Sequence, residues 1–237
     1  LPTSLAVVQV NNGQPSYGFY REGIADRDYQ VEQVLALLAQ SAPGVLHTGS
    51  LLLVPPESDK VLAILRGAKR LGWTLSVDVN LRPLLANNLA LYLAAVAEAA
   101  ALADWLKASD EDLALLGYPG ADLKSAAGIA QDFKANGASR VALTFGSQGA
   151  WLDVDGAQAG QAAPAITVVD TVGAGDTFWG NCLADWVLAP QGAAARVAVT
   201  LQQAMQAAAI NCTRQGCQPP TPAEVAAFRP FRPFKPD

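Results

Sequence analysis

The sequence predicts an α/β fold with a largely parallel central sheet and helices on both faces of that sheet. Short apolar segments rich in β-branched residues alternate with longer segments of helical spacing along the 237 residues. Several of the apolar segments end in glycine or small polar residues, as buried parallel strands do at the end where ligands gather. Apolar residues make up 51% of the chain and charged residues 16%, which excludes a disordered or fibrous protein.

Eight segments have the apolar or aromatic character of strands and are bounded by turn residues. They are residues 5–10, 17–20, 45–49, 73–78, 105–109, 140–144, 150–154 and 166–170. The first two flank a turn sequence and predict a β-hairpin. Seven segments predict helices, at residues 29–40, 58–72, 89–103, 110–116, 123–136, 177–188 and 193–211. The Gly-, Ala- and Gln-rich segment 156–163 predicts a loop.

The charge balance argues against nucleic acid as a partner. Lysine and arginine number 16 against 21 acidic residues, a formal net charge of -5, so no basic stripe exists to neutralise a phosphate backbone. The most apolar stretch, residues 84–106, contains Asn87, Asn88, Glu98 and Asp104. A membrane span needs about twenty nearly uncharged residues, so we expect no membrane partner.

Three cysteines are too few, and odd in number, for a secreted disulfide scaffold. We therefore expect free thiols and a cytoplasmic location. The single histidine, His47, argues against a structural zinc site and is expected to be hydrogen-bonded near a strand end. The chain starts at Leu1 within an apparent strand, and its only methionine is Met205, so we expect that an N-terminal portion is missing.

Residues 173–178 (GAGDTF) connect a predicted strand to a long predicted helix. Two glycines allow a tight turn, so the N–H groups of Ala174, Gly175 and Asp176 can point at one anion near the positive end of the helix. Asp176 would then act as a base that removes a proton from an attacking hydroxyl. The alternative, weighed about evenly on these residues alone, is that Asp176 caps the helix. The chain has no Gly-Lys pair for a Walker loop, and Phe178 breaks a GxGxxG fingerprint.

Five motifs occur in the order of the ribokinase-like (PfkB) carbohydrate kinase family, and the chain resembles that family over essentially its whole length. Residues 170–178 (DTVGAGDTF) look like the family's C-terminal signature, and residues 143–150 (LTFGSQGA) resemble its nucleotide-binding loop. Residues 78–83 (DVNLRP) are similar to a segment of bacterial fructokinases and 2-keto-3-deoxygluconate kinases, and residues 107–112 (KASDED) resemble a segment of fructokinases. Residues 213–220 (TRQGCQPP) look like the closing loop.

The resemblance implies a ribokinase-like three-layer αβα domain over residues 28–237, with residues 1–27 as part of a small β lid and the entry to the core. Relatives often dimerise through this lid, so the resemblance allows a homodimer. In the lid, Phe19 and Arg21 would face the sugar.

The resemblance also implies catalytic roles. Asp176 would be the general base on the sugar hydroxyl, and Gly173, Ala174 and Gly175 would surround the transferring phosphoryl group. Arg82 would approach the phosphates of ATP and the sugar. The open alternative is that Arg82 forms an ion pair at the surface.

The residues implied at the nucleotide and Mg²⁺ site come from three motifs. They are Asn80, Ser109, Asp112, Thr144, Gly146, Ser147, Gln148, Gly149 and Gly175. A K⁺ site is implied as well, with Pro220 where ribokinase has a serine ligand. Its ligands would be the Asp170 carboxylate and the carbonyls of Val172, Asn211, Arg214 and Gly216.

For the substrate, residues 19–26 (FYREGIAD) are closer to the fructokinase pattern. We therefore expect ATP-dependent phosphorylation of a primary hydroxyl of a ketose, fructose to fructose 6-phosphate. A 2-keto-3-deoxygluconate kinase is the alternative, because Arg21 and Arg82 could match a substrate carboxylate. A sugar-sensing protein without chemistry is the third reading, but such a protein should have lost Asp176 or the glycines beside it.

Overall fold

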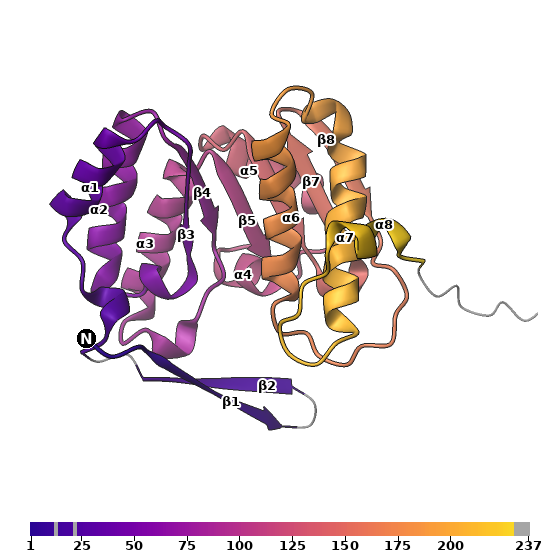
Figure 1. Cartoon of the computed structure of the whole chain (residues 1–237), viewed down its shortest axis with the longest axis horizontal. Coiled ribbons are helices and arrows are strands. Elements are labelled where there is room, and N and C mark those ends of the chain that lie inside the picture. Colours follow the sequence, from indigo (N-terminus) through magenta and orange to yellow (C-terminus); the bar gives the residue numbers. More distant parts are fainter. Residues whose placement is uncertain (12–13, 21–22, 230–237) are drawn as a thin grey trace, which may run out of the picture. The chain divides into compact units, whose positions relative to one another are not determined.

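A computed structural model describes residues 1–11, 14–20 and 23–229 (Figure 1). The chain divides into two compact units, Leu1–Asp104 and Trp105–Asp237. The boundary that we expect after residue 27 is a different division and stays a prediction. The main sheet has the strand order β3-β4-β5-β6-β7-β8, with β3 and β4 in the first unit and the other four strands in the second. This mixed sheet with flanking helices confirms the predicted α/β class.

The first unit begins with a hairpin that forms its own two-stranded sheet, as predicted. Its strands are β1 (Leu5–Asn11) and β2 (Gln14–Tyr20), paired antiparallel. The remaining elements are η1 (Ala25–Arg27), α1 (Val31–Gln40), β3 (Val45–Gly49), η2 (Ser50–Leu53), α2 (Glu57–Arg70), β4 (Thr74–Asp78), η3 (Pro83–Leu85) and α3 (Leu89–Leu102).

Strands β3 and β4 are parallel neighbours, and their ends approach each other closely. Gly49 pairs with Asp78 in the register, and a Cβ on Gly49 would lie 1.9 Å from the Asp78 carbonyl oxygen. Only glycine fits that approach. Two residues earlier, His47 Nδ1 and Ser76 Oγ are 2.9 Å apart, which confirms that the histidine is hydrogen-bonded. Helix α2 buries an apolar stripe of residues three and four apart, including Val61, Leu65 and Ala68.

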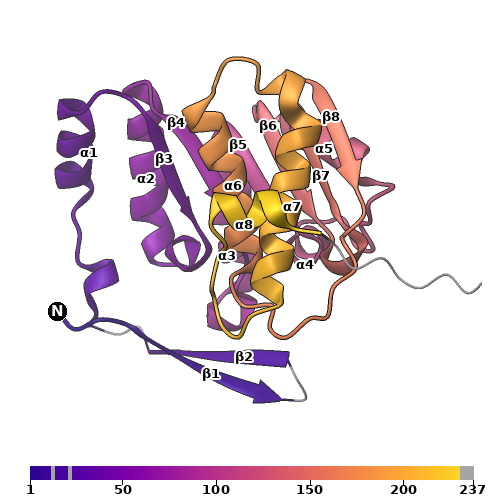
Figure 2. The ribbon, with the colours of Figure 1, turned by 45° about the vertical axis from the view of Figure 1, so that its right-hand side comes forward.

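The second unit carries the larger part of the sheet. Its elements are β5 (Trp105–Ser109), α4 (Asp110–Leu115), α5 (Ala126–Ala135), β6 (Arg140–Thr144), η4 (Gly146–Gln148), β7 (Ala150–Val154), β8 (Ala157–Gln161), α6 (Ala174–Leu188), η5 (Ala194–Arg196), α7 (Val197–Cys212) and α8 (Pro222–Ala227). Strand β6 runs parallel to β5 and antiparallel to β7. Helices α6 and α7 cover one face of these strands, and α5 lies on the other (Figure 2).

An aromatic cluster fastens α6 to the sheet. The ring of Trp186 meets the rings of Trp105 and Trp179 edge to face, at centroid distances of 5.3 and 5.4 Å. The guanidinium of Arg140 lies over Trp105 and Trp186, at 4.8 and 5.2 Å from the ring centroids, and pairs with Asp155. Such edge-to-face and cation–π contacts add to the burial of these large side chains.

On the other face, an ion pair with a buried carboxylate ties α5 to β7. The Asp153 carboxylate of β7 is completely buried, and Lys134 Nζ lies 2.7 Å from it. The amide of Gln158 and the N–H of Gly156 also donate to Asp153, at 2.8 and 3.1 Å. A buried carboxylate needs such partners, so this group fixes the turn between β7 and β8.

Two local predictions are wrong. Residues 157–161 form strand β8 rather than a loop, because Asp155 and Gly156 take left-handed backbone angles that close a tight hairpin onto β7. Residues 166–170 form no strand. Instead of a neighbouring strand, the N–H groups of Val169 and Asp170 bond to the carbonyl of Cys212, at 2.8 and 3.2 Å.

Helix α8 was not predicted, although its sequence carries a start signal. Thr221 and Glu224 form a capping box, with Thr221 Oγ1 accepting from the Glu224 N–H and Glu224 accepting from the Thr221 N–H. Pro222 takes the first helical position, where its missing N–H has no effect. Among the described residues, no helix combines the length and apolar character that a bilayer crossing demands.

We expect Gly149→Ala to lower the free energy of unfolding by at least about 2 kcal/mol. Gly149 has φ +128°, and a Cβ there would lie 2.0 Å from the Gln161 carbonyl oxygen, so the start of β7 and the end of β8 would have to separate. Urea denaturation measures the loss. Gly128→Ala in α5, where a Cβ meets no atom within 4 Å, is the matched control and should be neutral or stabilising by about 0.5–1 kcal/mol. Equal effects of the two substitutions would contradict this account.

Candidate functional site

The start of α6 is built on a left-handed glycine. Gly173 is the N-cap, with φ 75°, and its carbonyl accepts from the Thr177 N–H at 2.9 Å. The Ala174 N–H donates to the Thr171 carbonyl at 3.2 Å, so it is already engaged in the turn. The first N–H groups of a helix have no partner within it, which leaves the amides of Gly175 and Asp176 as donors for an anion.

Asp176 lies in the first turn of α6 and is exposed. It is the third residue of the helix, the N-cap is Gly173, and no side chain caps the start of α6. The capping alternative for Asp176 is therefore not what the structure shows. An exposed carboxylate beside two orphan amides can take up a proton while the amides hold a negatively charged group.

Both glycines of this turn are closely approached by other segments. A Cβ on Gly173 would lie 2.2 Å from Cys217 Sγ, in the loop that follows α7. A Cβ on Gly175 would lie 3.3 Å from Nζ of Lys107, on β5. Lys107 is only 4% exposed. Lys107 is therefore a buried cation beside the first turn of α6.

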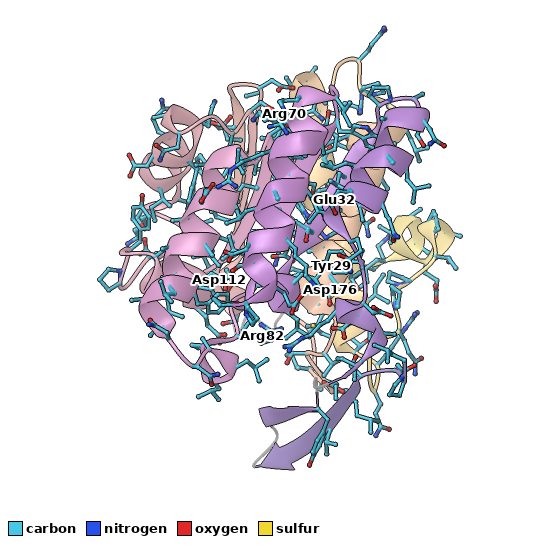
Figure 3. The ribbon with its side chains drawn as sticks, turned by 90° about the vertical axis from the view of Figure 1, so that its left-hand side faces the viewer. Tyr29, Glu32, Arg70, Arg82, Asp112 and Asp176 are labelled. Atoms are coloured by element: carbon cyan, nitrogen blue, oxygen red, sulfur yellow. The ribbon has the colours of Figure 1, made fainter. Side chains whose placement is uncertain are left out.

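At the carboxyl end of β5, Ser109 and Asp112 form the capping box of α4. The Asp112 carboxylate accepts from both the N–H and the hydroxyl of Ser109, each at 2.8 Å, and Asp112 is 3% exposed. Their predicted contact with phosphates or Mg²⁺ stays a prediction. Asp112 lies in the first turn of α4 and Asp176 in the first turn of α6, and both are labelled in Figure 3.

The loop between β6 and β7 follows the same edge, because Thr144 is the register partner of Ser109. Phe145 is buried, and its N–H donates to the Gly149 carbonyl at 2.9 Å, which closes the loop. Gly146, Ser147 and Gln148 form the short helix η4 and are exposed. The predicted nucleotide residues of this loop, Thr144, Gly146, Ser147, Gln148 and Gly149, therefore surround one turn at the end of β6.

The residues predicted for a monovalent cation lie in one hydrogen-bonded network. Asp170 accepts from the N–H groups of Val172 and Gly216, both at 2.9 Å. These hydrogen bonds lower the pKa of the Asp170 carboxyl below its ordinary value. Asn211 is fully buried and donates its amide to the Val172 carbonyl at 2.8 Å, while its own carbonyl accepts from the Arg214 N–H at 3.0 Å.

In the first unit, the loop after β4 holds Asn80 and Arg82. Asn80 has φ +38°, a left-handed conformation that asparagine tolerates better than most residues. The guanidinium of Arg82 donates to the Asn80 side chain and to the Leu81 carbonyl. The backbone N–H of Arg82 donates to the Tyr92 hydroxyl at 3.1 Å. Among the described residues, Arg82 has no acidic partner. The alternative that Arg82 is a surface ion-pair residue is therefore not what the structure shows.

The predicted site residues thus fall into two sets. The second unit brings together the starts of α4 and α6 and the loops at 144–149 and 211–218, and the first unit holds Asn80 and Arg82. Phe19 lies on β2, where its backbone pairs with Ala6. Arg21 lies outside the described residues.

We expect Asp170→Asn to lower the thermal unfolding midpoint at pH 7, because an amide NH₂ cannot accept one of the two backbone bonds. The lowered pKa means that the carboxylate stabilises the fold fully above its ordinary value of 3.8 and less as the pH falls through the lower folded value. The difference in midpoint between the variant and the wild-type should therefore shrink as the pH falls below 3.8. Glu111→Gln, with the same charge change at an exposed site, is the control. A constant gap between pH 7 and 3 would contradict this role of Asp170.

Comparison with known proteins identifies relatives for this arrangement. Residues 1–224 match the model of the pfkB family of carbohydrate kinases. A fructokinase of Rhizobium leguminosarum bv. trifolii is 32% identical over 183 residues, which cover 77% of this chain and 54% of that protein. A 2-dehydro-3-deoxygluconokinase of Bacillus subtilis (strain 168) is 31% identical over 185 residues, 75% of this chain and 54% of the relative. The chain therefore spans about half the length of these relatives.

Two solved structures share the fold. Fructokinase from Xylella fastidiosa with bound ATP has a TM-score of 0.77 at 26% identity, over 95% of this chain and 72% of that one. A double mutant of fructokinase from Vibrio cholerae O395, with fructose, ADP and potassium ion bound, has a TM-score of 0.78 at 28% identity, over the same shares. With the family model covering nearly all of its residues, this chain belongs to the pfkB family of carbohydrate kinases.

Proposed function

We propose that this protein is an ATP-dependent sugar kinase that transfers the γ-phosphoryl group to a primary hydroxyl of a ketose, fructose to fructose 6-phosphate. One observation carries the proposal. The first turn of α6 presents the orphan amides of Gly175 and Asp176 together with an exposed carboxylate that caps nothing. The fructokinases among the similar proteins support fructose as the acceptor.

In the proposed reaction, the Asp176 carboxylate takes the proton of the primary hydroxyl as its oxygen attacks the γ-phosphorus. The bond between the γ-phosphorus and the bridging oxygen breaks, and ADP leaves with that oxygen. Phosphoryl transfer asks of a protein mainly positioning and charge stabilisation. The amides of Gly175 and Asp176 supply preorganised donors for the equatorial oxygens. Arg82 is our candidate for a further positive charge on the phosphates, and Phe19 and Arg21 for contact with the sugar.

The nucleotide is proposed to lie along the loop at 144–149 with Asn80. Mg²⁺ would neutralise charge on the phosphates and would need few protein ligands. Asp112, supported by Ser109, is our candidate to hold it. A K⁺ ion fits the oxygen-rich network of Asp170, Val172, Asn211, Arg214 and Gly216, since each carbonyl has a second lone pair. The potassium ion in the Vibrio cholerae fructokinase supports this site. The hairpin β1–β2 is the proposed lid and the candidate surface for a homodimer.

We expect Asp176→Asn to reduce turnover with saturating fructose and ATP by about 10²–10⁴-fold, because the amide cannot accept the proton. Nucleotide binding should stay within about threefold of wild-type, since the amides of the turn are unchanged. Glu32→Gln on α1, an exposed acid in the other unit, is the control and should keep full turnover. A coupled assay for ADP measures the loss. Wild-type turnover in Asp176→Asn would refute the role of the base.

The second candidate is a 2-keto-3-deoxygluconate kinase, which the Bacillus subtilis relative favours. That substrate carries a carboxylate, which Arg82 and Arg21 could bind. A panel of fructose, 2-keto-3-deoxygluconate and ribose, assayed by kcat/KM, separates the two. We expect kcat/KM for fructose to exceed that for 2-keto-3-deoxygluconate by at least about tenfold. In a site built for fructose, the carboxylate of the keto acid would be buried without a matching partner. A preference for the keto acid would favour the second candidate. Sugar binding without turnover would favour the sensor without chemistry.

A further inference from the structure

Lys107 is a buried lysine that the proposed reaction does not yet use. It is the third residue of β5 and is 4% exposed. Alternate side chains of a strand share a face, so Trp105, Lys107 and Ser109 lie on the same side of β5. Trp105 contacts Trp186 of α6 edge to face. The side of β5 that carries Lys107 is therefore the side that α6 covers.

The ammonium group of Lys107 lies at the first turn of α6. A Cβ built on Gly175 would be 3.3 Å from Nζ and 3.7 Å from Cε of Lys107. Its charge also acts two turns further along the helix. Burial and Asp185 raise the pKa of the Cys182 thiol, and Lys107 opposes that effect. The aliphatic stem thus runs beneath α6 and brings the charge to its amino-terminal end.

A cation at this place strengthens an existing field. The amino-terminal end of a helix is its positive end, so the ammonium adds to the field of the orphan amides. Charge interactions are screened less in a buried site than at the surface. The more negative charge a bound ligand places at the amides of Gly175 and Asp176, the more the Lys107 ammonium stabilises its binding.

We propose that Lys107 is a positioning residue for the phosphoryl group that the first turn of α6 binds, and that it acts through this turn on the terminal phosphate of ATP. The inference rests on the proposed kinase function and deepens it. It assigns Lys107 to the phosphate that distinguishes ATP from ADP. A lysine that served only to pack β5 against α6 would have no such preference.

The test compares the dissociation constants of MgATP, MgADP and adenosine by isothermal titration calorimetry. In Lys107→Met, which keeps an unbranched apolar stem and removes the charged ammonium group, MgATP should bind at least about tenfold more weakly. MgADP should change by less than about threefold and adenosine not at all, because neither carries the terminal phosphate. Lys107→Arg retains the charge and should retain the wild-type ratio of MgATP to MgADP affinity.

The matched control is Lys134→Met, which removes a lysine paired with buried Asp153 on the other face of the sheet. It should lower the thermal midpoint and leave the affinity ratio unchanged. Three outcomes would overturn the inference and leave the proposed function standing. They are an unchanged ratio of MgATP to MgADP affinity in Lys107→Met, an equal loss of affinity for all three ligands in that variant, and a lost ratio in Lys107→Arg. The Arg variant keeps the test decisive if Lys107→Met does not fold. A wild-type chain that binds neither nucleotide overturns the proposed function and the inference with it.

Discussion

The candidate site depends on one backbone constraint, the left-handed turn at Gly173 against the loop that follows α7. A side chain at Gly173 would collide with Cys217, so α6 can start where it does only because this residue is glycine. The same loop is fastened by Asp170, which accepts from Val172 on one side and Gly216 on the other. The orphan amides and the Asp176 carboxylate take their positions from the start of α6, and the Lys107 ammonium of β5 lies beside it.

Much of the fold could be predicted from sequence, because its strands are short apolar segments with glycine or polar residues at their ends. β3, β5, β6 and β7 have the bounds that the pattern predicts. β8 does not look like a strand, since Gly, Ala and Gln carry little strand preference. Its pairing is imposed by the tight turn at Asp155 and Gly156 and by its position at the edge of the sheet. The apolar segment 166–170 differs from the prediction in the opposite direction. Its composition suits a strand, but the N–H groups of Val169 and Asp170 bond to the carbonyl of Cys212 and the segment forms no strand.

The candidate site shows the same division. The glycines and Asp176 could be found from the motif, since turn chemistry is local and visible in the sequence. The burial of Lys107 could not, because it depends on α6 crossing β5, a contact between residues about seventy positions apart. The only sequence signal was a charged residue within an otherwise apolar strand segment, which is a reason to ask what faces it. The capping boxes of α4 and α8 are local signals, because each pairs a hydroxyl residue with an acid three positions later.

The edge-to-face indoles of Trp105, Trp179 and Trp186 give this protein a natural optical reporter. Aromatic rings held in a fixed chiral arrangement produce near-ultraviolet circular dichroism, which disappears when tertiary packing loosens. Two of the three rings belong to α6 and the third to β5, the strand that also carries Lys107. The intensity of that band would therefore follow the seating of the helix on its strand, without any label and in the absence of substrate.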